Sequence, residues 1–270
     1  MKIFDMHVHI FPDRIAEKAT AAIGVFYENF SMEGDGRLET AIQAMDRAGI
    51  SRCAAHSVAT TAHQVDSINA FVMDAHRRYP DRIVPFAAMH PALEKPAETA
   101  EAVIRQGFCG VKLHPEIQRF RIDDPRVMDM LAPFEGRLPV LCHCGDYRYD
   151  NSSPERLKRV MRAFPRLRLI CAHLGGWTVW REAWHRLVDE DVYVDTSSAL
   201  FALSPEEAVE IIRAYGSDRA IYGTDYPMWR PEGEIERFNR LPLTESERAD
   251  ILWNNHLRLF EESGIALPAD

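Results

Sequence analysis

The sequence contains no apolar run near the roughly 18–20 residues needed to cross a bilayer, and histidines interrupt its first ten residues, MKIFDMHVHI, where an export signal would be apolar. Cysteine is scarce, and the five cysteines lack paired spacing, so we expect no disulfide framework. Positive charge is also scarce: 32 Lys and Arg against 41 Asp and Glu give a net charge of −9, which argues against nucleic-acid binding. These absences favour a reduced, soluble, cytoplasmic protein.

What the sequence does contain is a regular alternation of short β-branched runs with amphipathic stretches of helical period. Between the runs, helices are favoured at 66–79, 97–106 and 153–164, among others. Eight strands, each followed by a helix, predict an α/β protein with a single (β/α)8 TIM-type barrel over residues 1–270 and an active site at the C-terminal ends of the strands. The expected strands are 2–10, 51–59, 82–90, 108–114, 138–145, 167–175, 192–199 and 220–226.

A doubly wound open sheet alternates in the same way and is the alternative fold. No G-x-G-x-x-G motif follows any strand, however, and polar residues cluster at many strand ends instead of at one switch point. The first connection, residues 11–36, is unusually long and rich in aromatic side chains, and a helix is expected after it at about 37–48. We therefore favour the barrel and expect residues 11–36 to form a flap over its mouth.

The His7-Val8-His9 segment is the most informative feature. Alternate residues of a strand share a face, so both imidazoles should point the same way at the C-terminal end of the first strand. Inside a barrel that direction is the axis, where active sites of this fold lie. Two imidazoles converge well on a divalent ion, but a stable site needs three or four ligands.

Other strand ends supply further ligand types. His143 lies near the end of the fifth expected strand, His173 near the end of the sixth, and Asp225 ends the eighth in GTDYP. Because strand eight closes against strand one in a barrel, Asp225 should lie beside His7 and His9, with strand five facing them across the mouth. Together these residues predict a metal site.

The fourth expected strand ends in GVKLHP, where Lys112 and His114 share a face and are candidate substrate contacts. The alternative is structural: an ion pair for the lysine and a turn cap for the histidine. His56 is a weaker candidate at the end of the second strand. Cys142 and Cys144 flank His143 with the opposite parity, so we expect them to pack in the core.

This combination of residues resembles the amidohydrolase superfamily, and more narrowly the branch that includes aminocarboxymuconate-semialdehyde decarboxylase. The likeness extends to residues 253–260, WNNHLRLF, which resemble the closing segment of that branch. The chain departs from the branch in lacking the insertions of the larger decarboxylases and in having His256 where a small residue is usual. The residues that carry the likeness are His7, His9, His143, His173 in CAHLGG and Asp225.

The resemblance implies one divalent ion, most often zinc, that binds and activates a water molecule. The implied ligands are His7, His9, His143 and Asp225. The resemblance further implies that Asp225 accepts the proton of that water and that His173 steers the attack or polarises a carbonyl group. A two-metal arrangement is the alternative, in which Lys112 is carboxylated and bridges two ions while His173 binds the second.

These residues predict a metal-dependent hydrolase of the amidohydrolase type, acting on a small carboxylate-bearing amide or lactone. One alternative is a metal-dependent, non-oxidative decarboxylase of a small carboxylic acid, a reaction that the same branch performs with the same ligands. Another, from a different class, is a non-catalytic small-molecule-binding barrel, against which the complete ligand set argues. We favour hydrolysis because the chain is compact and hydrolases are the broader group. The expected partner is a small molecule, with no nucleic acid and no membrane, and a homodimer is left open.

Arginines in the loops that follow strands predict an anionic substrate, because a guanidinium fork binds a carboxylate through two hydrogen bonds. Arg148 is the first candidate, since the strand before it also supplies His143. Trp177 and Trp229 lie in loops of the same kind and are expected to supply apolar walls. The four arginines are Arg119, Arg121, Arg148 and Arg230.

Overall fold

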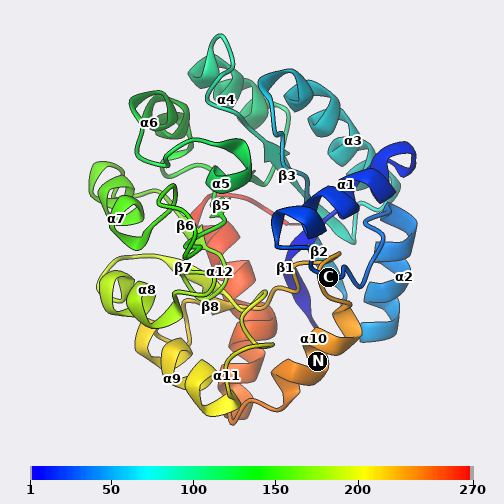
Figure 1. The fold of residues 1–270 in the computed structure, drawn as a ribbon, viewed down its shortest axis with the longest axis vertical. Helices are drawn as coiled ribbons and strands as arrows, with labels where there is room; N and C mark the ends of the chain where they lie inside the picture. Colours follow the sequence, from blue (N-terminus) through cyan, green and yellow to red (C-terminus); the bar gives the residue numbers. More distant parts are fainter. Residues whose placement is uncertain (1, 268–270) are drawn as a thin grey trace.

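Eight parallel strands follow one another in chain order around a single sheet, inside a ring of helices (Figure 1). The computed structural model describes residues 2–267. The segment after the eighth strand closes the barrel: Met6 N donates to Tyr222 O at 2.9 Å and His9 N to Tyr226 O at 2.8 Å. The predicted (β/α)8 barrel is therefore confirmed. The strands are β1 (Phe4–His9), β2 (Arg52–His56), β3 (Ile83–Ala88), β4 (Gly110–Leu113), β5 (Val140–Cys142), β6 (Leu169–Cys171), β7 (Tyr193–Asp195) and β8 (Ala220–Ile221).

Helices cover the outside of the barrel. The three helices predicted at 66–79, 97–106 and 153–164 are present as α3, α4 and α7, each within one residue at both ends. Proline stands in the first turn of several helices, where its missing N–H has no intrahelical partner to lose. The helices are α1 (Asp13–Phe26), α2 (Leu38–Ala48), α3 (Val65–Arg78), α4 (Pro96–Arg105), α5 (Pro115–Gln118), α6 (Pro125–Leu131), α7 (Pro154–Ala163), α8 (Trp180–Leu187), α9 (Pro205–Tyr215), α10 (Pro231–Asn239), α11 (Glu245–Ala249) and α12 (Asn255–Glu262).

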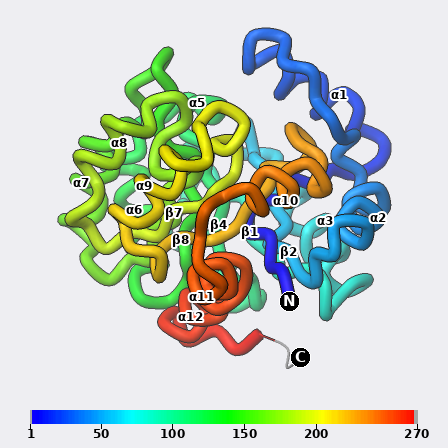
Figure 2. The backbone as a smooth tube through the Cα atoms, turned by 90° about the horizontal axis from the view of Figure 1, so that it is seen from below, coloured from blue at the N-terminus to red at the C-terminus, as the bar shows by residue number. Residues whose placement is uncertain are grey.

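The long first connection contains a regular helix, α1, that the sequence analysis treated as part of a flap. Figure 2 shows α1 at one end of the barrel, with α12 at the other. Residues 30–36 return beneath α1, and Thr20 Oγ1 donates to Asp35 O at 3.0 Å. The C-terminal end of α1 reaches the strand ends, because Tyr27 Oη lies 2.9 Å from His114 Nε2. This helix therefore covers part of the barrel mouth.

The barrel has an inner apolar layer around its axis and an outer apolar layer between strands and helices. Along β1, the side chains that point into the inner layer at the start of the strand give way to side chains that point into the outer layer. Phe4 and Met6 pack in the inner cluster that α12 closes with Leu259, whereas Val8 packs in the outer cluster between strands and helices. The pairing of β1 with β2 shifts register between Asp5 and Val8. Strict alternation from Phe4 would direct the two predicted histidines outward, and this irregularity instead directs them toward the axis.

The five cysteines are free thiols, and Cys142 and Cys144 pack in the outer apolar layer, as their parity predicts. Within residues 2–267, no helix combines the length and the apolar character that a membrane span requires.

Candidate metal centre and active site

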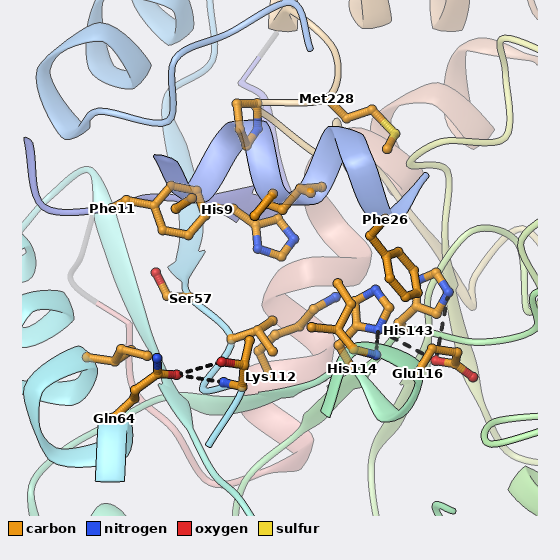
Figure 3. Close-up of a pocket in the computed structure, with 18 of the residues that line it drawn as sticks. His9, Phe11, Phe26, Ser57, Gln64, Lys112, His114, Glu116, His143 and Met228 are labelled. Carbon is orange, nitrogen blue, oxygen red and sulfur yellow. Dashed lines mark hydrogen bonds and ion pairs between the residues drawn. The ribbon is translucent and has the colours of Figure 1, made fainter. Parts of the chain in front are cut away.

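The C-terminal ends of the strands open into a cavity of about 1130 Å³ that lies between the barrel mouth and α1 (Figure 3). The predicted residues on its inner wall come from five different strands or the residues that follow them. All are buried except Asp225, whose side chain is 13% exposed. They are His7, His9, Lys112, His114, His143, His173 and Asp225.

Asp225 lies between the two histidines of β1. Its Oδ1 is 3.3 Å from His7 Nε2 and 3.4 Å from His9 Nε2. Ligands that bind one tetrahedral ion at 2.0–2.2 Å are separated by about 3.3–3.6 Å, so this spacing fits a shared ion. Burial alone would raise the pKa of Asp225, but His7 and then the other nearby histidines hold it below its usual value. The carboxylate is therefore ionised, as a metal ligand must be.

Asp195, at the end of β7, orients His7. Its Oδ2 accepts a hydrogen bond from His7 Nδ1 at 2.9 Å, and its Oδ1 accepts from the backbone N–H groups of His173 at 2.9 Å and Ser197 at 3.0 Å. Fixing the proton on Nδ1 leaves the Nε2 lone pair free for an ion, as in many metal sites. Asp195 is not among the residues predicted for the site, although an acidic residue that ends an apolar strand is a signal visible in the sequence.

Lys112 on β4 competes for the same histidine nitrogen. Its Nζ lies 2.7 Å from His7 Nε2, and burial lowers the pKa of this lysine. One lone pair cannot serve both groups, so an ion at His7 requires the amine to turn aside. The predicted contact between Lys112 and a substrate stays a prediction.

His143 and His173 face each other at the far side of the centre. His173 Nε2 lies 3.0 Å from His143 Nδ1, and the geometry groups His173 with His7 and Asp225 as potential ligands. His143 instead belongs to a second group, with His114 and Glu116. A metal-binding role for His143 and a catalytic role for His173 stay predictions.

Glu116 is a buried acid at the site that was not among the predicted residues. Its Oε1 accepts hydrogen bonds from Ser152 N at 3.0 Å and Ser152 Oγ at 2.5 Å, whereas Oε2 has no hydrogen-bond partner within residues 2–267. That oxygen faces His114 Nδ1 at 3.6 Å and His143 Nε2 at 4.0 Å. Burial raises the pKa of Glu116 to about 8, so its carboxyl group is largely protonated at neutral pH. The signal in the sequence was an acid directly after the strand end, in LHPE.

His56, at the end of β2, lies beside the same centre. Its ring centroid is 4.4 Å from that of His9 and 5.2 Å from that of His7. Neither ring nitrogen has a hydrogen-bond partner among the described residues, and burial keeps the pKa of His56 well below its usual value. The three imidazoles form a further group of potential ligands.

The structure places Arg148 differently from the predicted substrate contact. Its guanidinium donates to both carboxylate oxygens of Asp146, at 2.9 and 2.7 Å, and to Phe26 O at 2.7 Å. Arg148 does not line the cavity. The buried carboxylate two residues earlier occupies the guanidinium fork, so Arg148 anchors the end of α1.

One of the four predicted arginines does line the cavity. Arg119 lines the cavity, whereas Arg121 and Arg230 do not. Arg14 and Lys18 of α1, which are not among the predicted residues, line the cavity as well. Positive charge at the mouth therefore comes mainly from the helix that covers it.

The two tryptophans do not line the cavity either, and each supports a residue that does. Trp229 Nε1 donates to Ser198 Oγ at 2.9 Å, and Ser198 Oγ donates to Asp225 Oδ2 at 2.6 Å. The ring of Trp177 packs edge to face on Tyr27, with centroids 4.9 Å apart. Trp229 thus orients the carboxylate, and Trp177 holds the end of α1.

A (β/α)8 barrel that gathers imidazoles and carboxylates at its C-terminal mouth has the arrangement of metal-dependent barrel enzymes. The amidohydrolase family profile matches residues 4–261. The chain therefore belongs to the amidohydrolase family, and it is an enzyme of that superfamily.

Two curated relatives are gamma-resorcylate decarboxylases. The protein of Polaromonas sp. is 25% identical over 118 residues, which are 36% of this chain and 35% of that protein. The protein of Rhizobium radiobacter is 28% identical over 122 residues, 38% of this chain and 36% of that protein. The matches span about a third of the length of these relatives.

Solved structures show the same fold over nearly the whole chain. An uncharacterised TIM-barrel protein from Bordetella bronchiseptica has a TM-score of 0.78 at 22% identity and covers 98% of this chain and 100% of its own. A 2,6-dihydroxybenzoate decarboxylase from Rhizobium has a TM-score of 0.70 at 19% identity, covering 96% and 98%. A dihydroxybenzoic acid decarboxylase from Polaromonas sp., with bound manganese and the inhibitor 2-nitroresorcinol, has a TM-score of 0.71 at 17% identity, covering 96% and 97%.

Proposed function

We propose that this chain is a metal-dependent, non-oxidative decarboxylase of a small aromatic carboxylic acid. The observation that carries the proposal is the position of Asp225 within 3.4 Å of both His7 and His9, on the floor of a large cavity, in a chain whose curated relatives are decarboxylases. The hydrolysis that the sequence favoured has less support from these relatives than the decarboxylation that was its alternative.

One divalent ion is the proposed cofactor. His7, His9 and Asp225 would hold it, with His143 as the fourth predicted ligand. When bound, the ion acts as a Lewis acid that stabilises negative charge on substrate oxygen atoms. Imidazole and carboxylate ligands suit several divalent metals, and a structural relative contains manganese, so zinc is one candidate among these.

Asp225 and His173 are the proposed proton carriers. When an aromatic acid loses CO₂, the ring carbon gains a proton as its bond to the carboxylate breaks, and the electron pair of that bond stays with the ring. Asp225 is ionised because nearby histidines lower its pKa, so its carboxylate can accept a proton from the solvent and deliver it to the ring carbon. His173 lies within the same buried group of ligand atoms and would share in this proton transfer. Lys112 would bind a carboxylate oxygen.

The test is a panel of ortho-hydroxybenzoates incubated with protein loaded with Mn²⁺ or Zn²⁺, with CO₂ and phenol measured together. A parallel panel of lactones and cyclic amides tests hydrolysis. We expect equimolar CO₂ and phenol from at least one acid, and loss of both products in Asp225→Asn. Hydrolysis of a lactone or amide without CO₂ from any acid would contradict the proposal and restore the hydrolase prediction.

A further inference from the structure

Helix α1 has one face that packs against protein. Ala16, Thr20 and Gly24 are its buried residues, spaced one turn apart. Thr20 and Gly24 face residues 30–36: Thr20 Oγ1 donates to Asp35 O, and a Cβ on Gly24 would lie 2.7 Å from Phe30 O, closer than any side chain tolerates. This face packs α1 against residues 30–36.

A second face of α1 is apolar and faces the cavity. Ile15, Ala19 and Ala22 recur at the three- and four-residue spacing of one helical stripe, and all three line the cavity. Ile15 is 43% exposed. A stripe of this kind normally packs against a protein surface, and here the opposite side is open cavity. The occupant that would cover it is therefore a ligand.

The size of the cavity agrees with an additional ligand segment. Its volume of about 1130 Å³ exceeds the roughly 300–1,000 Å³ of usual small-molecule sites. A single aromatic ring with a carboxylate fills only the inner, histidine-lined part. Besides α1, the residues that line the cavity include Val58, which precedes α3, and Ile68 of α3.

Two cations lie on the same helix, at the outer part of the cavity. Arg14 and Lys18 are one turn apart, exposed, and among the lining residues. Across residues 2–267, neither forms an ion pair with an acidic side chain. Like charges four residues apart on a helix repel each other, and an anion placed between them removes this cost. The protein as a whole carries a net charge of −9, so this pair of positive charges has the opposite sign to the net charge of the protein.

We propose that the substrate is an elongated dianion: an aromatic acid extended by an apolar arm that ends in a second carboxylate. The arm packs on Ile15, Ala19 and Ala22, and the second carboxylate binds Arg14 and Lys18. The placement of the first carboxylate at the histidine centre rests on the proposed function. The arm and its terminal charge rest on α1 alone.

Calorimetric titration of the metal-loaded, full-length protein tests this with three probes. Salicylate has neither arm nor second charge, 5-phenylsalicylate has the arm, and 5-(4-carboxyphenyl)salicylate has both. We expect 5-phenylsalicylate to bind more tightly than salicylate, and the dianion to bind at least tenfold more tightly than salicylate. Equal affinities for the three probes would overturn the proposal.

Two variants separate the arm from the charge. Ala19→Trp fills the space along the apolar stripe, so it should abolish the preference for both longer probes and leave salicylate binding unchanged. Ala21→Trp is the matched control, because Ala21 lies on the same helix and does not line this cavity. Arg14→Ala combined with Lys18→Ala should weaken binding of the dianion tenfold or more without affecting 5-phenylsalicylate. The control is Arg162→Ala, an exposed arginine of α7.

Release of CO₂ is measured separately, so that the two proposals can fail independently. If the longer probes bind more tightly as expected but no probe releases CO₂, the result supports the binding site for the arm and contradicts the proposed decarboxylation. Release of CO₂ without preference for the longer probes contradicts the arm alone. Sedimentation provides a further check: if Ala19→Trp turns a dimer into a monomer and leaves all probe affinities unchanged, the stripe is a contact between copies and the proposal is wrong.

Discussion

His7 on β1 donates a hydrogen bond from Nδ1 to Asp195 Oδ2 on β7 at 2.9 Å, and neither side chain is more than 1% exposed. The bond fixes the tautomer of the imidazole, so the Nε2 lone pair faces Asp225 and Lys112. The chemistry available at His7 is thus set by a residue that is not itself among the proposed ligands.

Asp195→Asn should lower the affinity for a divalent ion by about 10–100-fold, the usual effect of removing a partner of a ligating histidine. The amide can donate to His7 Nδ1, which moves the imidazole proton to Nε2 and removes the lone pair that an ion needs. Competition with a chromophoric chelator measures this affinity. Asp191→Asn, at an exposed position, is the control, and equal affinity in both variants would argue against the role of Asp195.

Elemental analysis should find one divalent ion per chain, and Asp225→Asn should reduce it to a small fraction. The reason is that Asp225 lies at ligand spacing from both His7 and His9. Two equivalents, both required for activity, would instead support the arrangement in which carboxylated Lys112 bridges two ions.

His173→Asn should keep the fold and the ion while turnover falls by about 10²–10⁴, the scale of general acid–base assistance. Asparagine is chosen because His173 has a φ of 61°, a left-handed conformation that asparagine tolerates better than alanine. Metal content, circular dichroism and turnover are measured on the same preparation. Loss of the ion would make His173 a ligand, and an unchanged rate would make it structural.

Arg148→Met should destabilise the attachment of α1. The change leaves the buried carboxylate of Asp146 unpaired and removes the hydrogen bond to Phe26 O, at a cost of about 3–5 kcal/mol. Hydrogen exchange should accelerate in residues 13–26, and KM should rise for neutral and anionic substrates alike. Adding Asp146→Asn should recover part of the lost stability. A rise in KM confined to anionic substrates, with α1 still protected, would restore the predicted substrate contact.

Glu234→Gln should change the dependence of stability on pH. Burial raises the pKa of Glu234 from 4.5 to about 7, despite the opposing effect of Arg237. The protonated carboxyl group therefore contributes fully to the free energy of unfolding below pH 4.5, and this contribution is lost as the pH rises through 7. At pH 8 the variant should be more stable than the parent by up to about 3 kcal/mol, with a much smaller difference at pH 5.

Urea unfolding at the two pH values measures this difference in the free energy of unfolding. Glu236→Gln, on the exposed side of the same helix, is the control. Parallel pH profiles of the parent and Glu234→Gln would contradict the buried, protonated state of Glu234.

Local periodicity accounts for what the sequence predicted well. The strands and the helices α3, α4 and α7 follow from the spacing of apolar residues, and this spacing is a property of neighbouring positions. Helix α1 was not predicted as a helix. Thr20, Gly24 and Val25 weaken its intrinsic preference, and its packing against residues 30–36 is a contact between segments that only the fold brings together.

That His7 and His9 share a face and that Asp225 follows the last strand could be read from the sequence, because both depend only on strand period and strand order. The other features of the site depend on contacts between distant segments. The register shift in β1 turned those histidines toward the axis, and closure of the barrel brought Asp195 to His7 across 188 residues of chain. The sequence showed that Arg148 is charged, but it did not show which group the guanidinium binds. In the folded protein the buried carboxylate of Asp146 accepts both hydrogen bonds of the guanidinium fork, so Arg148 does not reach the cavity.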